Sequence, residues 1–168
     1  MKFTIFLICF LSTLVLAAPI NVALNKPVTA TGSYQAPSYA VDGNFGTAWN
    51  AGSYAVQYIE INLLQAYWID SITCSVGQLP NGNTVHQIYL DGVLAHTWSQ
   101  YTSSGDLLTV NFGSLKSATT VRVTTTSSPS WIAWNEIQVF AYVPEISSLW
   151  FLLLGIFLIP KLLVVRNL

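Results

Sequence analysis

Short runs in which apolar and polar residues alternate recur through the middle of the chain. In residues 119–125, Val121 and Val123 share one face with the threonines at both ends of the run, while Arg122 and Thr124 face the other way. Residues 107–112 and, less regularly, 56–63 follow the same period of two. Successive side chains of a strand point to opposite faces of a sheet, so these runs predict half-buried β-strands.

Clusters of turn-forming residues separate the runs, at 79–83, 91–92, 103–106 and 127–130. Gly permits positive φ, Pro fixes φ, and Asn, Asp and Ser side chains bond to nearby backbone groups. Between residues 18 and 143 we find no sustained helical repeat, internal repeat or linker. The pattern therefore predicts one all-β domain, a sandwich of two packed sheets.

Apolar ends of the chain explain much of its composition, which is 52% hydrophobic and only 8% charged. Lys2 precedes an apolar run, residues 3–16, which is followed by the small residues Ala17 and Ala18, as in a secretory signal peptide. We expect residues 1–17 to be removed by cleavage after Ala17; a retained anchor is the alternative. The exported chain then keeps Cys74 alone, which allows no intramolecular disulfide.

The other end carries twenty residues, 146–165, in which Lys161 is the one charged residue. As a helix this stretch measures about 30 Å, enough to cross a bilayer, and we place the transmembrane helix at about 147–165. Pro144 and Glu145 precede this apolar stretch, and the whole segment 144–168 resembles a degenerate PEP-CTERM tail. That resemblance implies processing by a sorting peptidase, an exosortase. Ile146 replaces the second proline of that motif, and a plain single-pass anchor is the alternative.

The charges of the exported body limit its partners. Residues 18–148 contain seven acidic and three basic residues, a net charge of minus four. Phosphate recognition depends on clustered Lys and Arg. The balance argues against nucleic-acid binding and gives no support for avid binding to anionic lipid.

Residues 40–49, AVDGNFGTAW, contain more turn-forming chemistry than a plain strand or helix would. Asp42, Thr47 and the carbonyls of such a turn could surround a hard cation such as Ca²⁺, which takes six to eight oxygen ligands. Another donor is needed, and Glu136 is the one acidic residue in the apolar run 131–142. A buried carboxylate must be paired, hydrated or metal-bound. A hydrogen-bonded turn without metal is the alternative.

Six stretches, in order, carry a resemblance to a known family: NVALNKPVTATG (21–32), AVDGNFGTAW (40–49), VQYIEINL (56–63), AYWIDSITCSV (66–76), TTVRVTT (119–125) and WNEIQVFAY (134–142). The chain resembles the coagulation factor 5/8 type C domain, also called the discoidin domain, and its bacterial relatives among galactose-binding-like carbohydrate-binding modules. The resemblance implies a discoidin-type jelly-roll β-sandwich of eight strands over residues 18–143.

The resemblance also implies a calcium site. Asp42, Asn44, Thr47 and Glu136 match positions that ligate a structural calcium in many relatives, Asn44 through its carbonyl. Ala48 stands where family members commonly carry an arginine, so sugar specificity cannot be transferred from them.

Catalysis has little support in the sequence. There are two histidines, His86 and His96, and no Ser, His and Asp in a recognised spacing, so no nucleophile with its base is indicated. No spacing suggests zinc. Asp42 and Glu136 would satisfy the two-carboxylate requirement of a glycosidase, but a shared cation explains them more economically. We expect a protein that is not an enzyme.

Aromatic residues in loops point instead to binding. Sugar sites combine an exposed ring with a few hydrogen-bonding groups, and the resemblance places ligands at loops on one end of the sandwich. The candidate ligand contacts are Tyr34, Gln35, Tyr54, His86 and Trp131. Each has a structural alternative: rim packing for the aromatics, and a structural or solvent-facing role for His86. Trp49 and Trp134 are expected in the core and Trp68 at an exposed edge.

These observations predict an exported cell-surface module that binds carbohydrate, either an exopolysaccharide or a glycan on a neighbouring cell. Two alternatives remain at this stage. One is adhesion through protein or lipid contact, and the other is a structural matrix protein without a ligand pocket.

Overall fold

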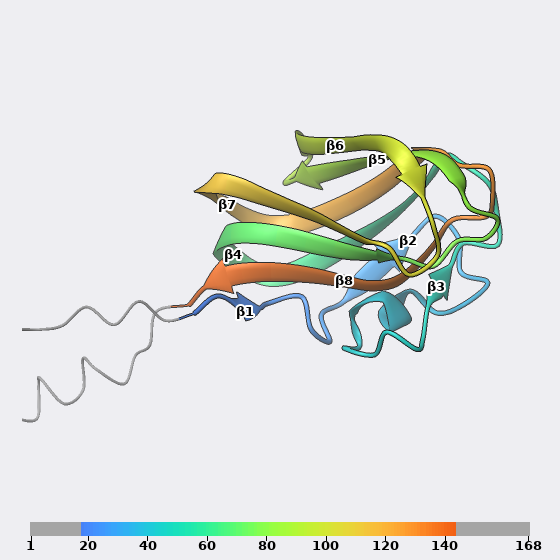
Figure 1. The fold of residues 1–168 in the computed structure, drawn as a ribbon. Coiled ribbons are helices and arrows are strands. Elements are labelled where there is room, and N and C mark those ends of the chain that lie inside the picture. The colour runs from blue at the N-terminus through green and yellow to red at the C-terminus, as the bar shows by residue number, and fades with distance from the viewer. Residues whose placement is uncertain (1–17, 144–168) are drawn as a thin grey trace, which may run out of the picture.

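Two long strands, β4 (Gln57–Val76) and β7 (Leu107–Ser127), pair antiparallel along most of their length and run through both layers of a β-sandwich (Figure 1). The computed structural model describes residues 18–143. The remaining elements are β1 (Ile20–Asn21), β2 (Val28–Ala30), the 3₁₀ helix η1 (Pro37–Val41), β3 (Trp49–Asn50), β5 (Gly82–Leu90), β6 (Val93–Thr102) and β8 (Ala133–Tyr142). The predicted all-β jelly-roll sandwich is confirmed.

Both long strands bend at the same end of the sandwich. The register of β4 against β7 shifts between Asn62 and Tyr67, around Leu64 with its φ of 71°, and again between Ile69 and Ser71. The second shift leaves residues 112–115 of β7, which include Gly113 at φ 67°, without partners on β4. Extra residues in one strand of a pair bend it and increase its twist. Each strand can thus leave one layer and continue in the other.

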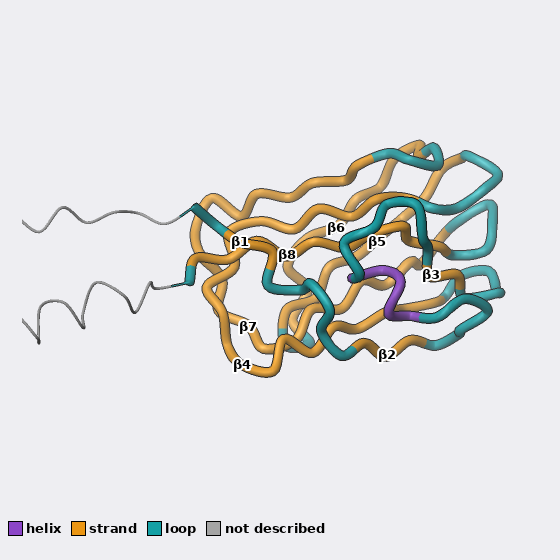
Figure 2. The backbone as a smooth tube through the Cα atoms, turned by 90° about the horizontal axis from the view of Figure 1, so that it is seen from below, coloured by secondary structure: helices purple, strands orange, loops and turns teal. Residues whose placement is uncertain are grey.

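The bends divide the strands into two layers. The first half of β4 and the second half of β7 join β2, β5 and β6; the other halves join β8, which also pairs with β1 and β3. In the view of Figure 2 both ends of the described chain lie beside the bends, and most of the connecting loops gather at the opposite end.

The core fills the space between the layers with alternate residues of each strand. Fully buried side chains include Ile59, Ile61, Leu63, Ile72, Val121, Ile137 and Val139. The face predicted for residues 119–125 is correct, because Val121, Val123 and Thr125 are buried while Arg122 and Thr124 are only partly so. The predicted core positions of Trp49 and Trp134 and the exposed position of Trp68 are also correct.

The predicted Asp91–Gly92 turn joins β5 to β6. Its residues have φ of 47° and 79°, and positive φ at both central positions is typical of a two-residue hairpin turn. The Asp91 carboxylate accepts bonds from the amides of Thr119 and Thr120 and from the Thr120 hydroxyl, at 2.8 to 3.2 Å. This turn is thereby fastened to β7 beside the bends.

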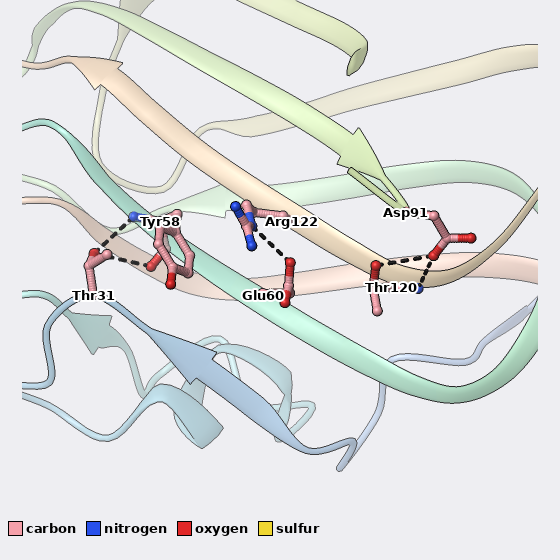
Figure 3. A network of polar contacts seen from close by, with 6 residues as sticks. All are labelled: Thr31, Tyr58, Glu60, Asp91, Thr120 and Arg122. Carbon is pink, nitrogen blue, oxygen red and sulfur yellow. Dashed lines mark hydrogen bonds and ion pairs between the residues drawn. The ribbon is translucent and has the colours of Figure 1, made fainter. Parts of the chain in front are cut away.

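Polar side chains cover the outer face of the β2–β4–β7 layer (Figure 3). The Arg122 Nε lies 2.8 Å from Glu60 Oε2, and its guanidinium stands 4.4 Å from the centroid of the Tyr58 ring. Thr31 exchanges bonds with the Tyr58 backbone. The ion pair is partly exposed, and such pairs contribute about 0 to 1 kcal/mol to the free energy of unfolding.

Among residues 18–143, no helix is long and apolar enough to span a membrane. The predicted signal peptide, 1–17, and the predicted tail, 144–168, lie outside the described residues.

Candidate functional site

Three loops meet at the end of the sandwich away from the bends. They are the segment after β2 that carries Tyr34, the β3–β4 connection at 51–56, and the β7–β8 connection at 128–132. Backbone bonds hold them together: the Gln35 amide donates to Asn50, the Ala51 amide to Ile132, and the Ile132 amide to Ser53, at 2.9 to 3.0 Å. Together these three segments are called the loop end below.

The loop end presents the aromatic residues predicted to contact a ligand. Tyr34 is 72% exposed and Trp131 is 43% exposed, and their ring centroids lie 5.9 Å apart in an edge-to-face arrangement. Such pairs are stabilised beyond their buried area. Gln35 is exposed beside Tyr34, and the exposed Tyr54 follows Ser53 in the next loop. The structure therefore brings Tyr34 and Trp131 into contact and puts Gln35 and Tyr54 on the same end.

Two glycines that sequence reasoning missed shape this end. A Cβ on Gly52, whose φ is +72°, would lie 2.8 Å from Tyr34 Cβ. A Cβ on Gly32 would collide with the carbonyl oxygen of Ala51, and the Gly32 carbonyl accepts a 2.8 Å bond from the Trp49 indole. The only signal in the sequence was the presence of glycine, which can mark either a turn or a close approach of chain segments.

His86 is not at the surface, contrary to its selection as a ligand contact. Its side chain is fully buried on β5, with Nδ1 2.9 Å from the Thr125 hydroxyl and its ring 4.7 Å from that of Trp134. It belongs to a layer of buried polar residues beneath the loop end: Gln78, Thr84, His86, Thr102, Thr125 and Ser130. Burial of the imidazole lowers its pKa to about 4, so the ring is neutral near pH 7.

Three buried polar atoms in this part of the protein find no hydrogen-bond partner within residues 18–143. They are His86 Nε2, Trp134 Nε1 and Gln78 Oε1. Leaving such groups unsatisfied costs about 1–3 kcal/mol each, and internal water commonly satisfies them. The Gln78 amide nitrogen donates to the Ser128 hydroxyl, which ties this layer to the loop that carries Trp131.

The turn at residues 42–47 lies against β8, as the sequence predicted. The Gly43 amide is 3.3 Å from both carboxylate oxygens of Glu136. The Thr47 hydroxyl is 2.8 Å from Asp42 Oδ2 and 2.8 Å from the Asn44 carbonyl oxygen. Oxygens from Asp42, Asn44 and Thr47 therefore cluster beside the turn that reaches Glu136.

Glu136 is in an unfavourable position for a charged group. Its side chain is fully buried, and the single amide of Gly43 is a weak partner for two carboxylate oxygens. Burial, opposed by the Gly43 bond and assisted by the charge of Asp42, raises the pKa of Glu136 to about 7. A cation between the carboxylates of Asp42 and Glu136 would favour the charged form of Glu136 and so lower its pKa.

The donor set fits a hard divalent cation. Two carboxylates, a hydroxyl and a main-chain carbonyl are oxygen ligands of the kind that calcium takes, whereas zinc sites are built mainly on Cys sulfur and His nitrogen. Residues 18–143 contain no group of three or more His, Cys, Asp and Glu side chains placed to hold a metal. Any cation here would depend on the Asn44 and Thr47 oxygens as well as on Asp42 and Glu136.

Comparisons with known proteins agree with this architecture. The family model for the F5/8 type C domain matches residues 24–139. A search of curated proteins finds no match. Among solved structures, the family 32 CBM of C. perfringens NanJ in complex with galactose has a TM-score of 0.62 at 23% identity, and covers 73% of this chain and 98% of its own.

Two further structures show the same fold. A fucolectin from striped bass serum, Morone saxatilis, has a TM-score of 0.64 at 21% identity, over 75% of this chain and 50% of its own. A Streptococcus pneumoniae fucose-binding module has a TM-score of 0.56 at 21% identity, over 73% and 96%. At these identities the likeness establishes the fold.

Replacing Gly52 should disturb Tyr34. Gly52→Ala adds backbone strain at positive φ and a collision with Tyr34 Cβ, and we expect a loss of about 1–3 kcal/mol in the free energy of unfolding. Gly105→Ala is the matched control, because Gly105 also has positive φ but nothing lies within 4 Å of an added Cβ. Urea denaturation should show the larger loss for Gly52→Ala; equal losses would mean that Tyr34 is not held by this contact.

Replacing His86 should change how stability depends on acid. The unfolded chain takes up a proton near pH 6.5, but the folded His86 does so only near pH 4. Between pH 6.5 and 4 the unfolded chain binds this proton and the folded chain does not, so the free energy of unfolding falls with the pH. The contribution of His86, about 3 kcal/mol, is fully present above pH 6.5 and is lost as the pH falls to 4. Glu136, with its raised pKa, changes in the opposite sense. The measurement is the difference in unfolding free energy between wild type and His86→Gln across pH 4 to 7.

The control for that experiment is His96→Gln, which removes the other histidine and leaves His86 in place. We expect the stability difference between wild type and His86→Gln to narrow toward pH 4, while the His96 variant follows the wild-type profile. A pH-independent difference for His86→Gln would show that the ring is not buried as described.

Proposed function

Because this chain belongs to the F5/8 type C domain family, we propose that it is a non-catalytic carbohydrate-binding module that works at the cell surface, on an exopolysaccharide or a cell-surface glycan. The observation that carries the proposal is the exposed Tyr34–Trp131 pair at the loop end. The ring faces can pack on the C–H faces of a sugar, and Gln35 beside them can bond its hydroxyls.

The pair is suited to binding because it is already ordered. Tyr34 is set by Gly52 and by the Gln35–Asn50 backbone bond, and Trp131 is flanked by the Ile132–Ser53 bond. A ligand would therefore spend little free energy on fixing these side chains. The rings stand on the surface and not in a deep cavity, so we expect contact with a terminal or short glycan segment and modest affinity for a single unit.

Charge narrows the class of sugar. The loop end and the neighbouring turns, 31–56, 77–82, 103–106 and 128–132, contain no Lys or Arg. Acidic polysaccharides would find no cation to pair with in these loops, whereas neutral and amino sugars need none. Related modules were solved with galactose, with chitotriose and with an unsaturated mannuronic acid. These structures therefore support a sugar ligand in general, and the preference for neutral and amino sugars rests on the charge of these loops.

We also propose a structural Ca²⁺ at the turn. The ion would be held by oxygens of Asp42, Asn44, Thr47 and Glu136. It would give the buried Glu136 carboxylate a positively charged partner. Its effect would be to fasten the 42–47 turn to β8, the strand that begins just after Trp131. The support is the clustering of these oxygens and the unfavourable position of the Glu136 carboxylate.

For the ends of the chain we propose export and attachment to a membrane. The support is sequence alone: the signal-peptide pattern in residues 1–17 and the apolar stretch in 146–165. Processing of the tail by a sorting peptidase is part of this proposal.

Removing the exposed tryptophan should weaken glycan binding. The full chain in detergent micelles is applied to an array of neutral, amino and acidic glycans, and we expect retention on neutral or amino glycans that free sugar reverses. Trp131→Ala should lower the affinity about tenfold or more. Trp68→Ala is the matched control, because Trp68 is 57% exposed and lies at the other end.

Equal weakening by both tryptophan variants, or retention on no glycan, would count against the carbohydrate proposal. Binding to protein or to lipid vesicles through the loop end, unaffected by sugar, would favour the adhesion alternative.

Calcium should stabilise the fold through Glu136. At a calcium concentration 100 times the dissociation constant, linkage adds about 2.7 kcal/mol to the free energy of unfolding, and chelation should lower the melting temperature by several degrees. The calcium effect should be larger at pH 8 than at pH 6, because the proton held by Glu136, with its pKa near 7, competes with the metal.

The variant Glu136→Gln should abolish this response, and Glu60→Gln, which changes a partly exposed glutamate paired with Arg122, should keep it. A wild-type melt that ignores both calcium and chelator would exclude the metal and leave the glycan proposal intact.

A further inference from the structure

The end of the sandwich that carries the bends has an apolar surface. Exposed side chains gather there from three segments: Leu64 and Trp68 of β4, Val93 and Leu94 after the Asp91–Gly92 turn, and Leu115 in the bend of β7. All five are at least 44% exposed. This set is called the corner surface below.

Pairings and contacts show that these segments are neighbours. Trp68 pairs with Ser117 on one side and with Tyr142, near the end of the described chain, on the other. Leu94 and Leu115 line one shallow hollow of about 450 Å³ together with Val93 and Lys116. The bonds from Thr119 and Thr120 to Asp91, drawn in part in Figure 3, hold the hairpin turn against β7. A group of exposed apolar side chains of this kind is typical of a surface that contacts a protein, a ligand or a membrane.

The chain leaves the domain at this corner. Ile20 pairs with Ala141, and Trp68 with Tyr142, so both ends of the described chain lie beside the corner surface (Figure 1). Only residues 144–146 separate Val143 from the predicted membrane segment at about 147–165. At about 3.5 Å per residue the connection spans at most about 14 Å. A bilayer holding that segment would lie within this distance of the corner.

The charges at the corner do not favour binding to anionic lipid headgroups, but they are compatible with apolar contact at the interface of a bilayer. Lys116 can extend its ammonium into the headgroup layer while its stem packs on apolar groups. The Asp91 carboxylate is already engaged by three donors of Thr119 and Thr120. Asp70, next to Ile69, is the other acid in this region, so one cation faces two acids. Contact would be driven by Trp68 and the leucines, and tryptophan favours the membrane interface.

We propose that the corner surface lies on the lipid bilayer that the chain enters after Val143, with Trp68, Leu94 and Leu115 in the interfacial layer. The inference rests on the predicted membrane segment and not on glycan binding. It fixes the orientation of the domain: β5 has nine residues between the two ends, about 30 Å at 3.3 Å per residue. The Tyr34–Trp131 pair would then face away from the membrane and lie about 30 Å from the corner surface.

The test uses the full chain in phosphatidylcholine nanodiscs, with an environment-sensitive fluorophore on single cysteines in a Cys9→Ser background. Cys74 is buried and burial raises the pKa of its thiol, so it does not compete for the label. The labelled variants are Leu94→Cys and Leu115→Cys at the corner, and Leu79→Cys as the matched exposed leucine near the opposite end.

We expect the labels at 94 and 115 to shift to shorter emission wavelength, to be quenched by nitroxide lipids and to be shielded from aqueous iodide. The label at 79 should show the reverse. Adding Trp68→Asp to the Leu94→Cys variant should reduce the lipid quenching without unfolding the domain, because Trp68 is exposed.

Three results would overturn the proposal: equal accessibility of all three labels to iodide, failure of the full chain to enter nanodiscs, or shielding that appears in lipid-free detergent with concentration-dependent dimerisation. The last would assign the corner surface to a second copy of the chain. None of them bears on retention by glycans, so the two proposals fail separately.

Discussion

The pairing of β4 with β7 is the constraint on which the rest of the structure depends. Each strand has half its length in each layer, and the two remain partners across the bends at Leu64 and Gly113. The bends fix where the two layers join. Among the remaining strands, β2 and β8 pair with β4, and β5 pairs with β7. Because both strands turn back at one end, most connections between strands are left at the other. The division into a corner and a loop end therefore follows from one antiparallel pair.

The aromatic pair and the proposed metal turn are linked through β8. Trp49 pairs with Trp134 and Asn50 with Ala133, so the segment that leaves the 42–47 turn is bonded to the same strand that holds Glu136. That strand begins directly after Trp131 and Ile132, whose backbone is bonded to Ser53 and Ala51. Any force that holds the turn against Glu136 also limits the motion of the loop that carries Trp131. Calcium would contribute to binding by restricting loop motion, without touching a sugar.

Sequence reasoning found what depends on local pattern and missed what depends on the approach of distant segments. The alternation in residues 119–125 and the Asp91–Gly92 turn are local, and both are correct. In β5 the period places His86 on the face of Ile88 and Leu90, but Val85 and Tyr89 make the other face apolar too. The buried face of this strand is therefore ambiguous in sequence. The fit of Gly52 under Tyr34 is tertiary and has no local signal. The nearness of Asp42 to Glu136 was inferred from the need for one more oxygen donor and from the single acid in residues 131–142, and the family resemblance supported that inference.

The two ends of the sandwich have surfaces of opposite kinds, and the difference has a physical consequence. At the loop end, backbone bonds and close glycine contacts hold the segments that carry the two rings. The surface of two rings is small, so a single sugar bound there would gain little buried area. Copies held in one membrane plane with that end outward would meet a polymeric glycan at many points at once. Linked binding events then add through effective concentration and need no new contact. In the proposed orientation, a shallow site on a short tether would become effective because the corner, and not the loops, would face the bilayer.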